Sequence, residues 1–396
     1  MKKSLQIILL FGLISFLGDV IYEGARSVNG PFLQILGLSA AAVGSIIGIG
    51  ELLGYALRLI TGFIIDRKNA HWVFLFIGYG LIAAIPMLST AGTWQFAALF
   101  IIAERVGKGI RAPARDTIIS SVSKNVGTGL SFGIHEAMDQ AGALTGPLIF
   151  AALFAFTGLN NGDLASYTGA YKYFWIPFIV LILVIIIIFF RAPKLEEFEA
   201  PEKKEKEKIP PLFWIYAVFT FLAAAGFINF AIIGYHFKLK GILADAMIPV
   251  YYAVAMAADG VFALAVGKLY DFMKVKTGKK HGGMYVLILI PVVSIIVPFI
   301  LFTAGRAAVL ASAILWGLVM ATHETIMRST IADITPLHKR GSGYGIFSVV
   351  YGLALFTGGA GAGLLYDISI PALVTGIIIV QAAAVGTFIF LNKKIT

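Results

Sequence analysis

Long apolar runs recur along the whole chain between short polar stretches, and this pattern constrains the fold more than any other feature. The hydrocarbon core of a bilayer is about 30 Å thick, so a helix of about 20 apolar residues crosses it. A helix also satisfies its own backbone hydrogen bonds, which a lipid-exposed segment must do. We therefore predict an all-α membrane protein with twelve transmembrane helices and no separate soluble domain. The predicted spans are residues 5–26, 40–65, 72–90, 94–113, 128–157, 170–191, 212–237, 245–271, 283–304, 307–328, 342–366 and 370–391.

The amino-acid composition supports the same class. Hydrophobic residues make up 59% of the 396 residues and charged residues only 13%. Soluble proteins carry about 25% charged residues, so a secreted enzyme, a nucleic-acid-binding module and a cytosolic dehydrogenase are excluded. The chain has no cysteine, which excludes a disulfide framework, a thiolate metal site and a cysteine nucleophile.

One long charged stretch, APKLEEFEAPEKKEKEKIPP, occupies residues 192–211 at the midpoint of the chain. Its dense charge, its prolines and its lack of an apolar stripe are typical of a solvated linker. We predict an N-terminal six-helix bundle at residues 1–191, a cytoplasmic linker at 192–211 and a C-terminal six-helix bundle at 212–396.

Basic residues concentrate in loops on one side of the predicted membrane. By the positive-inside rule, that side is cytoplasmic and holds both termini. The first apolar run is expected to remain as an uncleaved span, because no small-residue cleavage site follows it. The predicted cytoplasmic cations are Lys2, Lys3, Arg67, Lys68, Lys124, Lys194, the 203–208 cluster, Lys274, Lys276, Lys279, Lys280, Lys339, Arg340, Lys393 and Lys394. The predicted outer cations are Lys172, Lys238, Lys240 and Arg306.

The turn after the second span carries the motif TGFIIDRK, residues 61–68. Gly62 allows close helix approach, and Asp66 and Arg67 can pair with a helix N-terminus or a carboxylate across the gap. Gly267 and Asp271 repeat the spacing after the eighth span, so we interpret these residues as a cytoplasmic gate rather than an ordinary charged turn. Two related six-helix halves are typical of a transporter whose site lies at the midplane.

The fourth span ends in a charged run, Glu104 to Asp116. An arginine in the membrane costs several kcal/mol unless it is paired and is retained mainly where it functions, which makes Arg105 a candidate switching charge. Gly107 and Gly109 allow a partner backbone to approach that helix. The charges assigned to the cytoplasmic gate or to snorkelling are Arg111, Arg115, Asp116 and, in the tenth span, Arg328.

The fifth span contains Gly133-x8-Gly142-x3-Gly146-Pro147. Small residues at this spacing form a close packing face, and the proline adds a bend. Generic helix packing remains an alternative interpretation of this spacing.

These motifs resemble those of the major facilitator superfamily over nearly the whole chain. Gly62-x-x-x-Asp66-Arg67 resembles the superfamily's loop motif, and Arg105-x-Gly107-x-Gly109 resembles its fourth-span motif. The fifth-span pattern is similar to the signature of the proton-coupled antiporter branch. The resemblance implies the twelve-helix fold and secondary transport.

A bacterial and archaeal subgroup of this superfamily, regarded as efflux transporters, is the nearest in motif. Its GKGIR-x-x-PRD and FG-x-H-x-AMD-x-x-GA-x-x-GP runs resemble residues 107–116 and 132–147, and its S-F-x-x-D-x-x-x-E run resembles residues 15–23. The chain departs from the family pattern in two places: Asn69 replaces a glycine of the loop motif, and no Gly-Gly pair follows Pro147. The second departure weakens the antiporter inference without removing it.

Ionisable residues inside the predicted spans are the best site candidates, because they are costly there. Asp19 and Glu23 lie four apart, as do His135 and Asp139, so each pair shares a helix face. A carboxyl group in low dielectric can hold a proton near neutral pH, and a nearby arginine favours its release. We assign proton coupling to these four residues and Arg105. The predicted substrate cavity contains Glu51, Arg58, Asn229, Tyr235, Asp259, His323, Glu324 and Tyr351.

The preferred hypothesis is a proton-coupled antiporter that exports a small molecule by alternating access. Three alternatives stay open. Asp19 and Glu23 form structural ion pairs with Arg26, Arg58 or Arg105; or the chain is a metabolite uniporter or symporter; or it is a divalent-metal transporter using His135, Asp139, Asp19 and Glu23. H-E-x-x-H and a phosphate-binding loop are absent, so we expect neither an enzyme nor direct use of ATP, and no cofactor or resident metal. The expected partners are a small-molecule substrate, protons and the lipid bilayer, without nucleic acid. We expect a functional monomer in the cell membrane.

Overall fold

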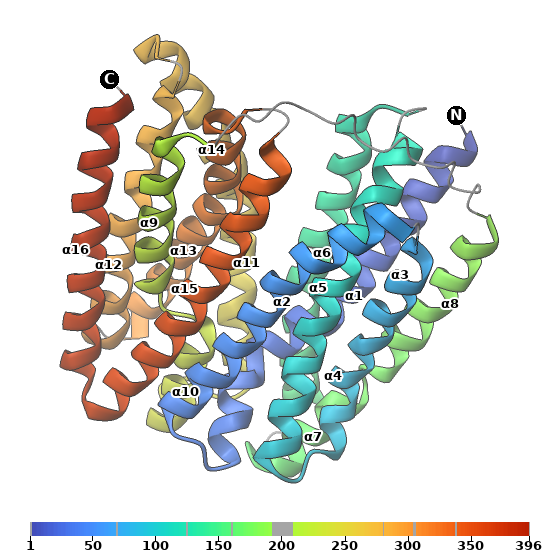
Figure 1. Cartoon of the computed structure of the whole chain (residues 1–396). Coiled ribbons are helices and arrows are strands. Elements are labelled where there is room, and N and C mark those ends of the chain that lie inside the picture. Colours follow the sequence, from blue (N-terminus) through green and yellow to red (C-terminus); the bar gives the residue numbers. More distant parts are fainter. Residues whose placement is uncertain are drawn as a thin grey trace. The chain divides into compact units, whose positions relative to one another are not determined.

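The computed structural model describes residues 2–68, 70–123, 126–159, 161–191, 209–279, 281–303, 306–336 and 339–395 (Figure 1). Every regular element in these ranges is a helix. The predicted all-α class is therefore confirmed. Most of the predicted linker, residues 192–208, lies outside the described residues.

The helices follow one another in chain order. In the first half they are α1 (Lys2–Ile35), α2 (Ala40–Lys68), α3 (His71–Gly80), η1 (Leu81–Ala83), α4 (Ala84–Met87), η2 (Leu88–Thr90), α5 (Trp94–Ser123), α6 (Thr128–Phe156), α7 (Leu164–Lys172) and α8 (Trp175–Arg191). In the second half they are α9 (Pro211–Ala225), α10 (Phe230–Lys240), α11 (Met247–Thr277), η3 (Gly282–Ile288), α12 (Leu289–Thr303), α13 (Arg306–Ala321), the π-helix η4 (Thr322–Ile326), α14 (Met327–Ile334), α15 (Arg340–Ile368) and α16 (Ile370–Ile395).

Eleven helical segments of the described chain are long and apolar enough to cross a membrane. Several of them combine consecutive helices, such as α7 with α8 and α9 with α10. The fourth predicted span corresponds to α5, which has 30 residues. This helix is not among the eleven segments. Its second half carries the charged run from Glu104 to Asp116, which makes the helix too polar to be recognised as a membrane span from hydropathy.

The chain forms two compact units. Unit 1 contains residues 1–38, 49–201 and 234–253, and unit 2 contains residues 39–48, 202–233 and 254–396. The predicted boundaries at 1–191, 192–211 and 212–396 stay a prediction.

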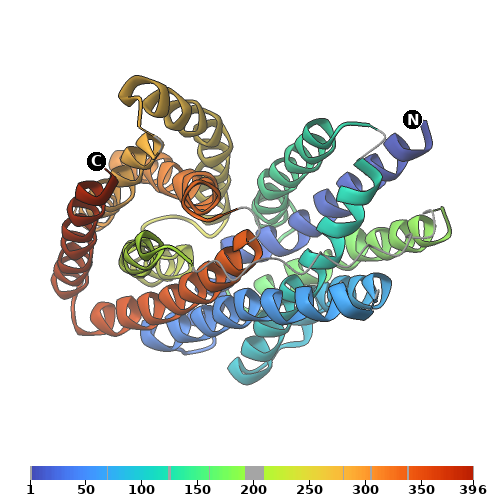
Figure 2. The ribbon, with the colours of Figure 1, turned by 45° about the horizontal axis from the view of Figure 1, so that its top comes forward.

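Close packing of α1 against α6 organises unit 1 (Figures 1 and 2). A methyl carbon on Gly142 would lie 2.5 Å from the carbonyl oxygen of Phe16. A methyl carbon on Gly146 would overlap the carbonyl oxygen of Val20. Association of helices within lipid depends on such packing, because burial away from lipid gives no hydrophobic gain. The two glycines therefore fix the distance between α1 and α6.

A polar cluster also ties α7 to the segment between α10 and α11 within unit 1. Lys238 Nζ lies 2.8 Å from a carboxylate oxygen of Asp245 and donates to the Gly162 carbonyl at 2.6 Å. The Tyr167 hydroxyl donates to Asp245. At the start of α7, Asp163 accepts from the Ser166 backbone N–H at 2.8 Å. The hydrogen bonds from Ser166 hold the pKa of the Asp163 carboxyl below its ordinary value.

In unit 2, α9 packs against α15 and α16 (Figure 2). Gly358 on α15 lies directly against the backbone of Ala225 at the end of α9. The side-chain amide of Gln381 on α16 donates to the Ala223 carbonyl at 3.0 Å. This hydrogen bond satisfies a backbone carbonyl near the break between α9 and α10, where the helix provides no partner.

Candidate functional site

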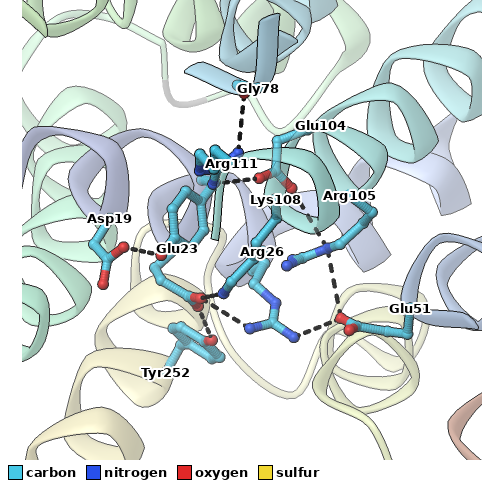
Figure 3. A network of polar contacts seen from close by, with 11 residues as sticks. Asp19, Glu23, Arg26, Glu51, Gly78, Glu104, Arg105, Lys108, Arg111 and Tyr252 are labelled. Atoms are coloured by element: carbon cyan, nitrogen blue, oxygen red, sulfur yellow. Dashed lines mark hydrogen bonds and ion pairs between the residues drawn. The ribbon is translucent and has the colours of Figure 1, made fainter. Parts of the chain in front are cut away.

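A row of ionisable residues on α1 forms the start of a buried network in unit 1 (Figure 3). Asp19, Glu23 and Arg26 are spaced by four and three residues, so they share one face of the helix. Arg26 donates to the Glu23 carboxylate at 2.8 Å, and Lys108 Nζ lies 3.9 Å from it. The hydroxyl of Tyr252, on α11, also donates to Glu23. Glu23 is thus held by two cations and a tyrosine.

The network continues to α2 through Glu51. Arg26 uses its second terminal nitrogen to reach Glu51 Oε1 at 2.8 Å. The Arg105 Nε of α5 lies 3.5 Å from the same oxygen. Glu51, predicted to line a substrate cavity, therefore bridges two arginines.

Charged residues on α5 form the third side of the network. Glu104 is 2% exposed and lies 3.5 Å from Arg105 and 3.3 Å from Arg111. Arg111 also lies 3.3 Å from the Gly78 carbonyl, to which it donates. Because Glu104, Lys108 and Arg111 are four and three residues apart, α5 presents them on one face.

Asp19 differs from these carboxylates in its contacts. It is 7% exposed and accepts a hydrogen bond from the Tyr22 hydroxyl. No lysine or arginine of the described residues forms an ion pair with it. A methyl carbon on Gly142 would lie 2.7 Å from Asp19 Cβ, so α6 packs closely against the base of this side chain.

The Tyr22 ring connects Asp19 to the cations of α5. Lys108 Nζ lies 4.4 Å from the ring centroid, and the guanidinium carbon of Arg111 lies 5.2 Å from it. Such cation–π contacts gain strength when the groups are desolvated. Tyr22 therefore contacts both the unpaired carboxyl and two of the network's cations.

The charges of this network do not balance by themselves. Its three carboxylates belong to Glu23, Glu51 and Glu104, and its four cations are Arg26, Arg105, Lys108 and Arg111. An ionised Asp19 next to the network would equalise the two signs. A protonated Asp19 leaves one positive charge in excess.

The predicted pair on α6 forms a separate contact with α1. His135 Nε2 lies 3.6 Å from Asp139 Oδ2 and 3.3 Å from the Ser15 hydroxyl. The structure thus brings His135 and Asp139 together, one turn from Asp19 along α1, but not into direct contact with the Glu23 network.

The other predicted residues of unit 1 lie apart from this network. The Arg58 guanidinium lies 4.6 Å from the centroid of the Tyr55 ring, and Arg115 pairs with its neighbour Asp116 at 3.0 Å. Gly133 has open space around it, unlike Gly142 and Gly146. Pro147 lies within α6. A methyl carbon on Gly62 would lie 3.9 Å from Pro113, whereas the side chains of Asp66 and Arg67 lie outside the described residues.

The predicted residues of unit 2 and α10 lie on several elements. His323, in the π-helix η4, lies 3.0 Å from the Tyr351 hydroxyl through Nδ1. Asn229 accepts from the Ile232 backbone N–H at 3.1 Å, between α9 and α10. A methyl carbon on Gly267 would lie 3.7 Å from Thr325. The remaining residues comprise two buried ones, Tyr235 and Asp259, and three exposed ones, Asp271, Glu324 and Arg328.

Sequence reasoning assigned no site role to five residues that the structure places in or beside the network. The helical spacing of Lys108 and Glu104 relative to Arg111 was a usable signal, since all three fall on one face of α5. Arg26 was also visible, one turn beyond Glu23. Tyr22 and Tyr252 gave no signal, because tyrosines are common at helix interfaces.

Residues Gly129, Ser131 and Gly133 match the G-x-S-x-G spacing of serine hydrolases. That motif requires a strained turn from a strand into a helix. Here Ser131 lies inside α6, and its hydroxyl donates to the Gly127 carbonyl at 2.8 Å. This spacing is therefore not a nucleophile elbow.

No three histidine, aspartate or glutamate side chains gather at metal-binding distances in the part of the chain that the structure describes. Of the four residues of the divalent-metal alternative, His135 and Asp139 contact each other, Glu23 belongs to the charge network, and Asp19 accepts a hydrogen bond from Tyr22.

Long apolar helices and a buried network of charge define a multi-pass helical membrane protein. The Major Facilitator Superfamily model matches residues 9–359. An uncharacterized protein of Mycobacterium tuberculosis is 36% identical over 387 residues, which cover 96% of this chain and 91% of that protein. An uncharacterized MFS-type transporter of Methanocaldococcus jannaschii is 24% identical over 367 residues, which cover 91% of this chain and 88% of that protein.

Solved structures show the same fold. The nucleoside transporter NupG superposes with a TM-score of 0.71 at 15% identity and covers 98% of each chain. A bacterial homologue of the human lysosomal transporter Spinster gives a TM-score of 0.70 at 16% identity, over 99% of this chain and 95% of that one. The chain belongs to the major facilitator superfamily. It is a membrane transporter of a small-molecule substrate, not an enzyme.

Proposed function

We propose that the chain is a proton-coupled antiporter that exports a small organic molecule by alternating access. The observation that supports this proposal is the environment of Asp19. Its carboxyl group is buried beside four cations and three carboxylates and accepts a hydrogen bond from Tyr22. Among these eight side chains, binding or release of one proton at Asp19 decides whether the numbers of positive and negative charges are equal. Because charge imbalance in low dielectric is costly, proton binding can bias the helices toward one arrangement.

Arg105 is the proposed switching charge. It lies 3.5 Å from Glu51 and 3.5 Å from Glu104, on two different helices. The Arg26 contacts are shorter, at 2.8 Å. Since longer ion pairs are weaker, Arg105 can exchange partners at less cost than Arg26. Glu23 then positions Arg26 and Lys108, and His135 with Asp139 serves as a relay or polar anchor.

The predicted cavity residues supply polar groups within each unit. In unit 1, Glu51 belongs to the charge network, and in unit 2, His323 and Tyr351 form a polar pair. A cationic or polar organic molecule fits the proton exchange, because a carboxylate can take up either a proton or a cation.

A thermal-shift titration with a panel of candidate ligands tests the proposal. Purified protein is titrated with tetraphenylphosphonium, ethidium, neutral metabolites and divalent metals at about pH 5.5 and about pH 8, since a ligand of the folded state raises its stability by mass action. We expect an organic cation to stabilise wild type more at the higher pH, because protons compete at Asp19. The pH difference should disappear in Asp19→Asn and persist in the exposed control Glu136→Gln.

Other outcomes identify the alternatives. A cation effect with equal strength at both pH values would contradict proton exchange and favour a uniporter. Stabilisation only by divalent metals, lost in His135→Ala, would favour metal transport. An unchanged pH difference in Asp19→Asn would exclude Asp19 as the proton carrier.

The proposal includes an orientation in the cell membrane with both termini cytoplasmic and the gate residues at that side. The absence of cysteine allows single-cysteine labelling. We expect Lys276→Cys to react with an impermeant maleimide only after the cells are opened, and Lys172→Cys to react in intact cells. The reverse pattern would invert the orientation.

We also propose that a single chain transports. Reconstitution at one chain per vesicle should retain uptake of the cation identified above. Loss of transport at that dilution, with recovery at several chains per vesicle, would contradict a functional monomer.

A further inference from the structure

Unit 2 contains a cavity that the proposed transport mechanism does not use. It has a volume of about 260 Å³ and lies among α9, α15 and α16. Four glycines and two alanines are among the twelve residues that line it. Their missing side chains leave the hollow, while Gly358 holds α15 directly against α9.

The lining of this cavity is apolar. Thr357 has the only polar side chain on the wall, and its hydroxyl donates to the Leu353 carbonyl of its own helix at 2.9 Å. The other lining side chains are aliphatic or aromatic, including Phe221, Leu365 and Val380. The cavity therefore selects hydrocarbon rather than a charged or strongly polar ligand.

The mouth of the cavity lies on an apolar surface. Thr357 is exposed, and Gly361 and Val380 are half-buried. Leu364 and Ile379, on the same two helices, are 58% and 64% exposed. A molecule can enter from the side of the helices.

The depth of the cavity follows from the turn at Ser369, which separates α15 from α16. Leu365 and Thr357 precede this turn by four and twelve residues, about 6 and 18 Å along a helix. Gly376 and Val380 follow it by seven and eleven residues, about 10 and 16 Å. All three lining helices belong to predicted membrane spans, and a hydrocarbon core of about 30 Å contains this depth. The surrounding solvent at the mouth is therefore lipid tails.

We propose that this cavity binds one acyl chain of a bilayer lipid. An apolar cavity of about 150 Å³ holds a benzene molecule, so about 260 Å³ accommodates on the order of ten carbons. This is the inner part of a common phospholipid tail, and the remainder and the headgroup stay in the bilayer leaflet next to the Ser369 turn. The tail packs beside Gly226, at the end of α9, where the predicted span 212–237 is interrupted before α10 begins.

Photo-crosslinking tests this site directly. Full-length protein is placed in nanodiscs that contain a phospholipid with a diazirine near the middle of one tail, and the labelled residues are located by peptide mass spectrometry after illumination. We expect label to concentrate at residues 357–365 and 376–380, above the level on exposed side chains elsewhere on α16.

Glycine offers a matched pair of variants. A methyl carbon on Gly361 meets no other atom within 4 Å, and Gly361 lines the cavity, so Gly361→Phe is the variant chosen to fill it. Gly386 has equal open space on α16 but lies outside the lining. We expect Gly361→Phe to reduce the label at the cavity about three- to fivefold, because the ring takes most of the space for about ten carbons. Gly386→Phe should leave it unchanged, and Gly361→Leu is the smaller filling variant should the first not fold.

Two results would overturn the proposal. Equal label at the cavity in Gly361→Phe, Gly361→Leu and wild type would mean that lipid touches only the outer surface. Displacement of the label by tetraphenylphosphonium would make the cavity a substrate site instead of a lipid site. Neither result bears on Asp19, so this proposal and the proton-exchange proposal fail separately.

Discussion

Removing the negative charge of Glu104 tests whether the buried network stabilises the fold as its geometry indicates. Glu104 is 2% exposed and lies 3.3 Å from Arg111 and 3.5 Å from Arg105. Glu104→Gln keeps the size of the side chain but makes the charge imbalance larger, because the four cations would face only Glu23 and Glu51. Loss of one partner from a buried ion pair costs about 3–5 kcal/mol, since the other charge stays buried.

This cost converts into a melting temperature. Unfolding entropy of about 2 cal/mol/K per residue gives roughly 0.8 kcal/mol/K for a chain of 396 residues. We therefore expect the melting temperature of the purified protein to fall by about 4–6 °C. Scanning fluorimetry in detergent measures it.

Two further variants separate charge balance from other effects. Glu136→Gln removes a carboxylate from an exposed position on α6, where it lies 3.5 Å from the Gln140 amide, and should change the melting temperature by less than about 1 °C. Arg111→Met in the Glu104→Gln background removes the stranded cation and should recover part of the loss, because coupled charges are not additive. A fall in Glu104→Gln no larger than in Glu136→Gln, or a strictly additive double variant, would refute the argument.

Further predictions concern packing and polar contacts in unit 1. Gly146→Ala should reduce the yield of folded protein, because its methyl group overlaps the backbone of α1. Gly133→Ala, which has open space around it, should melt at or above the wild-type temperature. Equal yields and melting temperatures of the two variants would contradict the packing argument. Lys238→Met removes a half-buried ion pair of 2.8 Å to Asp245 and should lower the melting temperature by about 1 °C, measured at low salt. Asp163 caps α7 and has a lowered pKa, so its stabilisation is complete above the ordinary carboxyl pKa and is lost as the pH falls through the lowered one. Hydrogen-exchange protection at the start of α7 should therefore decrease on acidification in wild type and stay low at every pH in Asp163→Ala.

The sequence alone determined the fold class and the positions of the spans. A bilayer admits only helices or closed barrels as spanning structures, so apolar runs of sufficient length leave little choice. The break between α9 and α10 and the π-helix at residues 322–326 were not predicted. Both interrupt otherwise continuous apolar runs, and hydropathy does not report on backbone hydrogen bonding.

Helical periodicity also determined which charges share a face. Asp19 with Glu23, and His135 with Asp139, were paired correctly along their helices, because spacing within one helix is local geometry. Their roles as proton carriers stay a prediction.

Tertiary structure alone decided which partners come from other helices, whereas Arg26 and Tyr22 lie three residues from Glu23 and Asp19 on the same helix. Glu51 lies 25 residues from Arg26, and Tyr252 lies 229 residues from Glu23; no local spacing relates them. Whether a buried carboxyl is paired depends on which neighbouring helix brings a cation within about 4 Å, and that depends on the close approach that glycines permit. For this reason the sequence identified Asp19 and Glu23 as an equivalent pair, whereas the tertiary structure added Lys108 of α5 and Tyr252 of α11 to Glu23, and Asp19 accepts a hydrogen bond from Tyr22 of its own helix.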